Sequence, residues 1–239
     1  MVDWRTDLLD GLAEKPTPEF CFERIAEQAR DIGFEYCAHG TRLPVPITRP
    51  RTTMHSNYPE AWQRRYHEQS YIDIDPTVAH GMRTSVPVVW NDAFFARVNA
   101  RQMWLEAQEH GLRHGWAQSR RDPEGTYSLL ALARSEGALT VAELQRLQPR
   151  MQWLVHAAHE AMRASSHDPA REPPAINLSD REIDVLRWTA EGKTSADVAE
   201  ILNISERTVN FHINSVVVKL GACNKTSAAV RAAMLGLLW

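Results

Sequence analysis

The sequence predicts two domains: an α/β (α+β) domain built on a mostly antiparallel sheet flanked by helices, then an all-α domain of four short helices. Three observations predict this fold class. Helix-periodic segments alternate with short strand-like runs up to residue 164. Three prolines and small polar residues then mark 165–177 as a linker. Only helical patterns follow, so we expect domains at 1–164 and 178–239.

The elements of the first domain follow from two periodicities. Apolar residues spaced three and four apart predict helices at 17–31, 59–69, 92–110 and 140–164. Short apolar or β-branched runs predict strands at 34–40, 51–56, 86–90, 114–120 and 126–134. RDPEG joins the last two strands, and its proline and glycine favour a tight turn. These two strands are therefore expected to form an antiparallel hairpin.

Capping residues mark the helices of the second domain. Ser179 with Glu182 forms a capping box, and Thr194 with Asp197 gives a second helix start. Ser205 begins a third helix, and 226–238 is the fourth. The tight turn Leu202-Asn203-Ile204-Ser205 between the second and third helices predicts a helix-turn-helix, whose second helix lies in the DNA major groove.

The third helix has two chemically different faces. Its buried face is predicted to be Val209, Ile213, Val216 and Leu220, spaced four, three and four apart. On the other face, the amides of Asn210 and Asn214 can hydrogen-bond to base edges, and Phe211 and Val218 suit thymine methyl groups. A plain four-helix bundle with a solvated face is the alternative, and the exposed apolar groups weigh against it.

Phosphate contacts are assigned to cations and helix starts. Arg207, Lys219 and Lys225 suit phosphates, and the helix amino termini near Thr194 and Ser205 add backbone N–H donors. From residue 177 onward, seven Lys and Arg face seven Asp and Glu, but no acidic residue follows Arg207. This distribution favours a local basic surface on a domain that is neutral overall.

Composition limits the remaining classes. The chain has 239 residues, is 44% hydrophobic and carries a net charge of −3, which is typical of a soluble globular protein. No apolar run approaches the roughly 20 residues that span a bilayer, and the first residues lack a signal-peptide core, so we expect no membrane partner and a cytoplasmic location. Three widely separated cysteines fit no metal-ligand spacing.

The second domain resembles the DNA-binding domain of LuxR-type transcription regulators. The resemblance runs from Leu178 to Ala233, through LSDREIDVLRWTAEGKTSADVAEILNISERTVNFHINSVVVKLGACNKTSAAVRAA. Its matching positions are Glu182, Leu186, Gly192, Ile201, Leu202, Ser205, Thr208, Val209, His212, Lys219 and Leu220. It implies binding to double-stranded DNA, with base contacts from Asn210, Phe211 and Asn214 and with Thr208 among the DNA-binding residues.

The first domain is not a phosphoacceptor receiver, because Lys15 is its only lysine. Its informative stretch is 57–90, which is dense in aromatic residues. The spacing of Tyr58, Trp62 and Tyr66 places three rings on one helix face. Asp75 is a carboxylate among apolar residues, where burial is unfavourable unless donors meet it. An ordinary aromatic core is the alternative interpretation of this stripe.

This region resembles the autoinducer-binding domain of LuxR-type regulators that respond to acyl-homoserine lactones. The resemblance rests on GFEYCAHG, YPEAW, Asp75-Pro76, Trp90 and AQEHGLRHG. It implies that Trp62 donates to the lactone carbonyl, Tyr58 donates to the acyl carbonyl and Asp75 accepts the amide N–H. Trp90 and Tyr66 then pack around the ligand. An indole donor, a carboxylate acceptor and a phenol do complement these ligand groups.

The details of the acyl chain stay open. Ala131 stands where many relatives have a serine or threonine that supports the polar head, and Ala117 offers no hydroxyl either. Further side chains that we expect to shape the pocket are Tyr36, His39, Met103 and Trp116.

These observations predict a ligand-responsive transcription regulator of quorum sensing. Ligand binding would complete the core of the first domain by satisfying Asp75, Trp62 and Tyr58, which need the ligand or water as a partner. It would thereby stabilise the protein and favour a homodimer that binds a palindromic promoter element. The stripe Leu144, Leu147, Met151 and Leu154 is either a dimer surface or core. RNA polymerase is a further candidate partner. No metal or cofactor is expected, since the lactone is a signal ligand.

Two alternatives remain. The regulator could be ligand-independent or respond to another small molecule. A lactone or amide hydrolase is disfavoured, because the sequence contains neither a GxSxG elbow nor HExxH.

Overall fold

The computed structural model describes residues 17–96, 100–166 and 176–238. They belong to two compact units, 1–42 with 52–121 and 127–168, and 43–51 with 122–126 and 169–239, which we describe separately. Most of the predicted linker, 167–175, lies outside the described residues. The predicted domain boundaries therefore stay a prediction. Across the described ranges, no helix has the length and apolar character needed to cross a membrane.

A five-stranded sheet in the order β2-β1-β5-β4-β3 forms the centre of the first unit. Every neighbouring pair is antiparallel, which confirms the predicted sheet type. The strands are β1 (Tyr36–Arg42), β2 (Thr52–Ser56), β3 (Val88–Trp90), β4 (His114–Arg121) and β5 (Tyr127–Arg134). β4 and β5 form the expected hairpin around the RDPEG turn.

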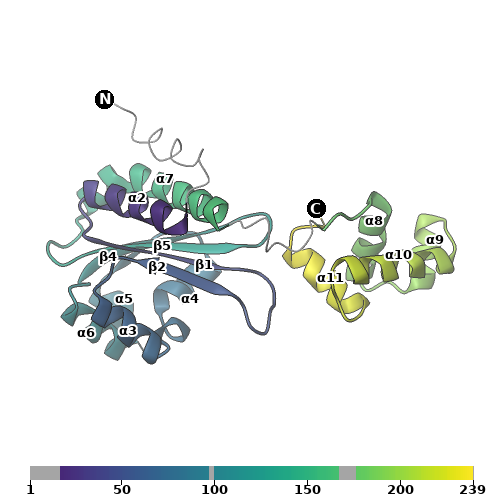
Figure 1. Ribbon diagram of the computed structural model, residues 1–239, viewed down its shortest axis with the longest axis horizontal. Helices are drawn as coiled ribbons and strands as arrows, with labels where there is room; N and C mark the ends of the chain where they lie inside the picture. Colours follow the sequence, from purple (N-terminus) through teal and green to yellow (C-terminus); the bar gives the residue numbers. More distant parts are fainter. Residues whose placement is uncertain (1–16, 97–99, 167–175, 239) are drawn as a thin grey trace. The chain divides into compact units, whose positions relative to one another are not determined.

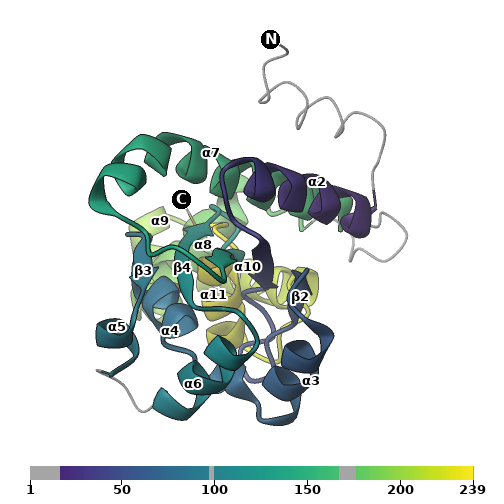
Figure 2. The same cartoon turned by 90° about the vertical axis from the view of Figure 1, so that its left-hand side faces the viewer.

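Helices cover both faces of this sheet (Figures 1 and 2). On one face lie α2 (Pro18–Asp31) and α7 (Val141–Ser165), side by side in both views. On the other lie α3 (Glu60–Glu68), α4 (Pro76–Arg83), α5 (Asp92–Ala96) and α6 (Arg101–Glu109), with the short 3₁₀ helix η1 (Tyr71–Asp73) after α3. We call the residues buried between the sheet and α3–α6 the aromatic layer. Its members are Ala38, Trp62, Tyr71, Trp90, Phe95, Ala100, Met103, Trp104, Ala107, Leu112, Ala117, Tyr127, Leu129, Ala131 and Ala133, with Tyr36, Tyr58, Tyr66, Val78, Val88 and Phe94 packed against them.

Strand alternation assigns each side chain to one of the two cores. Along β5, Leu130 and Leu132 pack with α2 and α7, whereas Leu129 and Ala131 join the aromatic layer. The expected dimer stripe is also interior, because Leu147, Met151 and Leu154 are at most 6% exposed and Leu144 packs against them. It belongs to the core, so it offers no dimer surface.

Two expected pocket residues lie on the wrong face of the sheet. Trp116 packs with the core beneath α2 and α7. His39 has the same strand parity as Cys37, which belongs to that core, and it lies near His159 of α7. Their assignment to the pocket is therefore wrong, since successive strand residues point to opposite faces. Tyr36 and Met103, in contrast, do lie in the aromatic layer.

The predicted helix 92–110 is two helices that fold back on each other. Trp104 of α6 donates to Asp92 Oδ1 of α5 at 2.6 Å, and its ring stacks on Phe95 with 4.2 Å between centroids. In one continuous helix, residues twelve apart would lie about 18 Å apart along the axis. The ring stack and the hydrogen bond therefore require the break.

Helix α4 was not predicted, although its start carries a recognisable signal. Asp75 is its N-cap and accepts the Thr77 N–H, and Pro76 occupies the first helical position. Both residue types are favoured at these places. The 3₁₀ helix η1 was not predicted either, whereas α2, α3 and α7 begin and end within one residue of their predicted bounds.

The second unit contains α8 (Asp180–Ala190), α9 (Ser195–Leu202), α10 (Glu206–Lys219) and α11 (Lys225–Met234). Both predicted capping boxes are formed, at Ser179 with Glu182 and at Thr194 with Asp197. Asn203 ends α9 in the left-handed region with φ 51°, which gives the tight turn before α10. The fourth helix ends at Met234, earlier than predicted, and Gly236 follows with φ 69°.

Buried His39 should make the protein sensitive to acid. Its side chain is 1% exposed, and neither ring nitrogen has a partner within the described part of the chain. Burial, then the nearby His159 and His55, lower its pKa to about 3. Between about pH 6.5 and pH 3 the unfolded chain therefore binds a proton at this histidine more readily than the folded chain does. As the pH is lowered through this range, the free energy of unfolding decreases by up to about 1.4 kcal/mol per pH unit.

His39→Leu should flatten this slope in urea unfolding measured from pH 4 to 7. His67→Leu changes an exposed histidine of α3 and should leave the slope intact. Equal slopes in the wild type and His39→Leu would contradict the assignment.

Candidate functional site

The aromatic layer rests on a row of alanines that crosses the sheet. In register, Ala38 of β1 lies opposite Ala131 of β5, which lies opposite Ala117 of β4. All three face the aromatic layer. Ser56 and Val88 continue the row on the edge strands. Three neighbouring methyl groups leave this strip of the sheet without long side chains on the face that the aromatic layer covers.

Aromatic side chains from α3 and η1 form a wall of the layer. The ring centroid of Trp62 lies 5.8 Å from those of Tyr66 and Tyr71. Tyr58 was expected on the same helix face, but it precedes α3, whose N-cap is Pro59. A residue before proline is disfavoured in the helical region. The ring of Tyr58 nevertheless packs in the layer, 6.3 Å from that of Tyr36.

Asp75 is held by donors of the protein itself. Its Oδ1 accepts from the Thr77 N–H and hydroxyl at 2.8 and 2.6 Å, and its Oδ2 accepts from the Tyr66 hydroxyl at 3.0 Å. Burial raises the pKa of Asp75, and the bonds from Thr77 and Tyr66 offset part of that rise. The expectation that Asp75 needs a ligand to satisfy it is therefore wrong, although its oxygens retain further acceptor capacity.

Three aromatic side chains of the layer have buried polar atoms that find no partner among the described residues. They are the Tyr58 hydroxyl, the Trp90 indole N–H and the Tyr127 hydroxyl. Buried polar groups are nearly always paired, so these atoms mark positions in the layer for a ligand or ordered water. Sequence reasoning missed Tyr127, although it shares the strand parity of Ala131 and alternation alone would place it here.

The predicted ligand residues of the first domain thus gather in one layer. Trp62, Trp90 and Met103 are buried in it, and Tyr58 and Tyr66 are partly buried against it. Asp75 joins them through its bond to Tyr66. Their contacts with a ligand stay a prediction.

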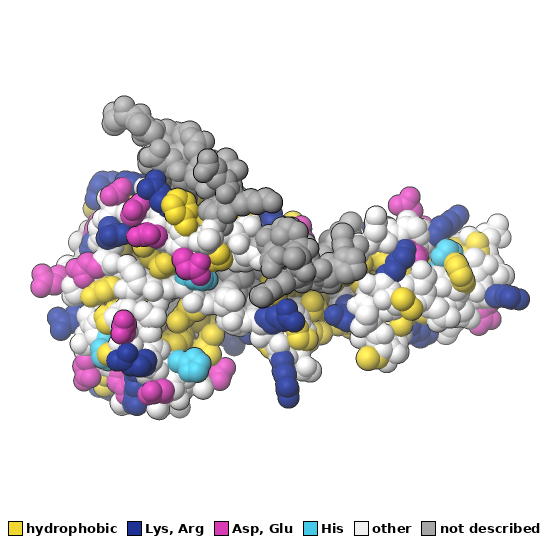
Figure 3. All heavy atoms as spheres, in the orientation of Figure 1, with side chains coloured by type: hydrophobic (Ala, Val, Ile, Leu, Met, Phe, Trp, Pro, Cys, Tyr) yellow, Lys and Arg dark blue, Asp and Glu magenta, His cyan; other side chains and the backbone are white. Residues whose placement is uncertain are grey.

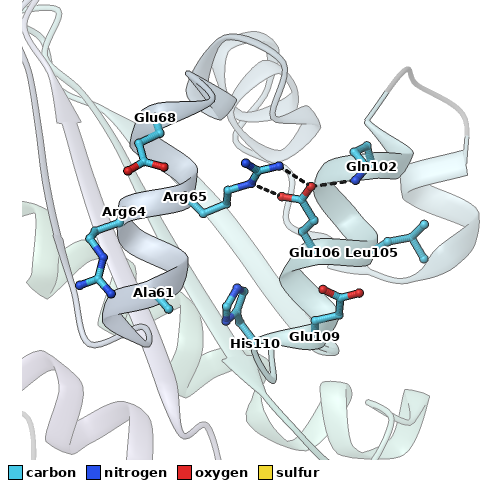
Figure 4. A pocket seen from close by; sticks show the side chains of 9 residues that line it. All are labelled: Ala61, Arg64, Arg65, Glu68, Gln102, Leu105, Glu106, Glu109 and His110. Carbon is cyan, nitrogen blue, oxygen red and sulfur yellow. Dashed lines mark hydrogen bonds and ion pairs between the residues drawn. The ribbon is translucent and has the colours of Figure 1, made fainter.

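A separate groove of about 540 Å³ lies between α3 and α6 (Figure 4). Arg65 binds Glu106 through two hydrogen bonds of 2.7 and 2.9 Å, and Tyr71 and Gln102 also donate to Glu106. The bond from Arg65, followed by that from Gln102, lowers the pKa of Glu106 to about 2. None of the predicted ligand residues lines this groove. The Glu106 cluster instead fixes α6 against the wall formed by α3 and η1.

The predicted DNA-reading face of α10 is exposed. Val209, Ile213, Val216 and Leu220 are buried as expected, whereas Phe211 is 68% and Val218 79% exposed. Figure 3 shows basic and hydrophobic side chains close together on the surface of this unit. Asn210 and Asn214 are exposed too. The Ser195 hydroxyl at the start of α9 donates to Asn210 Oδ1 at 2.8 Å and so fixes the orientation of that amide.

The cations predicted to contact phosphates have different surroundings. Arg207 and Lys225 are exposed. Lys219 instead donates to Glu182 Oε2 at 2.7 Å, so the basic end of α10 does face a carboxylate. Burial alone would raise the pKa of Glu182, but bonds from Lys219, Ser215 and Ser179 outweigh it and hold the pKa at about 2. The phosphate role of Lys219 stays a prediction that competes with this ion pair.

The cap hydroxyls of the unit are already engaged within the protein. The Thr194 and Ser205 hydroxyls accept the N–H groups of Asp197 and Thr208. The Ser205 and Thr208 hydroxyls also lie 2.7 Å apart. If these hydroxyls contact DNA, the same oxygen atoms must also keep their hydrogen bonds at the helix starts.

Comparison with known proteins assigns both units. The family described as "Autoinducer binding domain" matches residues 17–162, and "Bacterial regulatory proteins, luxR family" matches 176–232. The transcriptional activator protein AnoR of Acinetobacter nosocomialis is 43% identical over 238 residues, with all of both chains covered. The chain belongs to the LuxR family of bacterial transcription regulators.

Solved structures of LuxR-type proteins agree with the fold. Escherichia coli SdiA in complex with octanoyl-rac-glycerol is 37% identical, with a TM-score of 0.78 over 100% of this chain and 98% of that one. The N-acylhomoserine lactone dependent CepR2 of Burkholderia cenocepacia is 34% identical, with a TM-score of 0.62 over 70% of this chain and 96% of that one. Both the predicted LuxR resemblance and the predicted fold class are confirmed.

Glu106→Gln should destabilise the first unit while keeping the side-chain shape. The substitution removes the charge that Arg65, Tyr71 and Gln102 share, and hydrogen bonds to charged groups are the stronger ones. We expect a lower urea midpoint of unfolding.

Glu109→Gln is the matched control, because Glu109 lines the same groove and is exposed. Its effect should be several-fold smaller. Equal effects of the two substitutions would show that the Glu106 cluster does not hold the wall.

Proposed function

We propose that this LuxR-type protein binds an N-acyl-homoserine lactone in the aromatic layer and regulates transcription in response to it. The observation that carries the proposal is the Asp75 carboxylate, bonded to Tyr66, in the same layer as a Tyr58 hydroxyl that has no partner among the described residues. An acyl-homoserine lactone has one N–H donor, several carbonyl acceptors and an apolar tail. This layer offers an acceptor, donors and an apolar floor to match.

Each polar group of the ligand has a partner in the proposal. The Trp62 indole donates to the lactone carbonyl, the Tyr58 hydroxyl donates to the acyl carbonyl, and Asp75 accepts the amide N–H. The bond from Tyr66 keeps the Asp75 carboxylate oriented before a ligand arrives. Trp90, Tyr66 and Met103 pack around the ligand. The lactone dependence of CepR2, a relative with the same fold, supports this ligand class.

An acyl glycerol is the second candidate ligand, because SdiA has been solved with octanoyl-rac-glycerol. It would meet Asp75 with a hydroxyl in place of an amide. Mass spectrometry of ligand extracted from protein produced with and without added lactone would distinguish the two, and recovery of intact lactone after long incubation would exclude a hydrolase. No ligand in either extract would favour the ligand-independent alternative.

Ligand binding would stabilise the folded chain. A ligand that binds only the folded state adds RT ln(1 + [L]/Kd), about 2.7 kcal/mol at a hundredfold excess over Kd. The stabilised protein would form a homodimer, so that two helix-turn-helix units meet the two halves of a palindromic promoter element. The dimer surface lies elsewhere than on the buried α7 stripe. RNA polymerase is a further proposed partner. The proposed location of the protein is the cytoplasm.

Asp75→Asn should abolish the stabilisation by ligand. Asparagine is as good an N-cap as aspartate, so α4 should still form, but its amide group presents a donor where the ligand N–H needs an acceptor. Thermal unfolding with and without N-octanoyl-L-homoserine lactone measures this. Asp73→Asn, an exposed carboxylate two residues away, should respond like the wild type. A full response by Asp75→Asn would rule out the proposed site.

In the second unit, α10 is proposed to lie in the major groove. Asn210, Phe211 and Asn214 would contact base edges. Phosphates would be met by Arg207, Lys225 and Lys219 and by the cap residues Thr194, Ser205 and Thr208. The bond from Ser195 supports a defined role for Asn210, since an amide held in one orientation discriminates better between donor and acceptor base edges.

Asn210→Ala should weaken binding to a selected operator by about tenfold or more while leaving ligand binding intact. Ser195→Ala should have a smaller effect, and it should add nothing once Asn210 is alanine, because Ser195 acts through that amide. Fluorescence anisotropy with DNA selected from a randomised library by the full chain measures all three variants. Asn177→Ala is an exposed control outside α10. Additive losses would contradict the coupling, and unchanged affinity would remove Asn210 from the reading face.

A further inference from the structure

Tyr127 is a buried phenol for which the proposed ligand contacts provide no partner. It opens β5, is 6% exposed, and its hydroxyl has no hydrogen-bond partner in the described ranges. Its side chain shares the sheet face of Leu129 and Ala131 and belongs to the aromatic layer. Burying a hydroxyl without a hydrogen-bond partner destabilises the folded state, because the group loses its hydrogen bonds to water. A group that binds here should therefore supply a polar atom.

The Tyr127 hydroxyl lies directly beneath α4. A Cβ atom added to Gly81 would collide with this oxygen, so the glycine is what lets the phenol reach under the helix. The same helix begins at the Asp75 cap, six residues earlier and about 9 Å along the axis. Burial, and then the charge of Asp75, raise the pKa of Tyr127 to about 12. The phenol is thus neutral, and its oxygen is near the proposed amide anchor.

The proposed contacts of a plain acyl-homoserine lactone leave no polar group of the ligand for Tyr127. Trp62, Tyr58 and Asp75 already account for the lactone carbonyl, the acyl carbonyl and the amide. Beyond these groups the unsubstituted chain offers only carbon and hydrogen. An oxygen on the third chain carbon lies up to about 5 Å from the amide nitrogen. With hydrogen bonds of about 2.8 Å to Asp75 and to Tyr127, the reach is about 10 Å, which is comparable with the rise of about 9 Å along α4.

The Trp90 indole N–H also lacks a partner in the described ranges, but it lies elsewhere in the layer. Trp90 pairs in register with Gly115, whereas Tyr127 pairs with Arg121, six residues further along β4. This places the two backbones about 20 Å apart along the strand. One chain oxygen cannot serve both groups. Tyr127 is the one beneath α4, and its hydroxyl both donates and accepts.

We propose that Tyr127 is a specificity-determining residue whose hydroxyl bonds to a keto or hydroxyl oxygen on the acyl chain of the ligand. This inference rests on the proposed function, because it presumes a lactone anchored at Asp75. The ligand class is accordingly an acyl-homoserine lactone with an oxygen-bearing chain.

The test compares three lactones of equal chain length on the full protein: N-octanoyl-, N-(3-oxooctanoyl)- and N-(3-hydroxyoctanoyl)-L-homoserine lactone. Their affinities are measured by quenching of tryptophan fluorescence. The wild type should bind one of the substituted lactones about tenfold more tightly than the octanoyl lactone. Tyr127→Phe removes one oxygen and adds no atom, so it should bring this ratio close to one and leave the octanoyl affinity unchanged or higher.

Ser128→Ala is the matched control. It removes a buried hydroxyl from the next residue of β5 on the opposite face of the sheet, where that hydroxyl lies 2.7 Å from His159 Nδ1, so the variant should keep the wild-type ratio even if it is less stable. A preference that survives in Tyr127→Phe, or a wild type that prefers the octanoyl lactone, would overturn the role of Tyr127 alone. Failure of the wild type to bind any of the three lactones would overturn the proposed function and this inference with it.

Discussion

The alternation of side chains across one antiparallel sheet is the constraint on which the first unit depends. Because both faces are covered by helices, each strand residue must fit one of two cores, and a shift of one residue would exchange them. This rule gathers Ala38, Ala131 and Ala117 into a row on one face. It places His39 and Trp116 on the other. The character of the aromatic layer is therefore set by the register of β1, β4 and β5 as much as by the rings that cover it.

Asp75 connects the fold of this layer to its proposed chemistry. One carboxylate oxygen caps α4, and the other accepts from Tyr66 of α3. The same group thus fixes where two helices lie and leaves an oriented acceptor among buried rings. The Glu106 cluster holds the outer side of the same wall from α6. A ligand in the layer would meet a wall that is fixed from both sides.

A buried carboxylate has the corresponding role in the second unit. Glu182 closes the capping box of α8 and accepts from Ser215 and Lys219 of α10, which joins the two helices. The opposite face of α10 stays exposed because the helix meets the bundle through its buried stripe and the neighbouring Val217, Ser215 and Lys219. Packing overrides the low helix propensity of the valines and isoleucines in this helix. Its outward amides are left for a partner, and Ser195 orients one of them.

The sequence by itself determined what depends on local spacing: the five strands, the two formed capping boxes, the helix-turn-helix and the buried stripe of α10. Only the tertiary structure decided which side chains meet across elements. It broke 92–110 into α5 and α6 through the contact of Trp104 with Asp92, paired Lys219 with Glu182 and placed Tyr127 beneath Gly81. Periodicity fixes the face on which a residue lies, but the partner on that face depends on how separate elements pack.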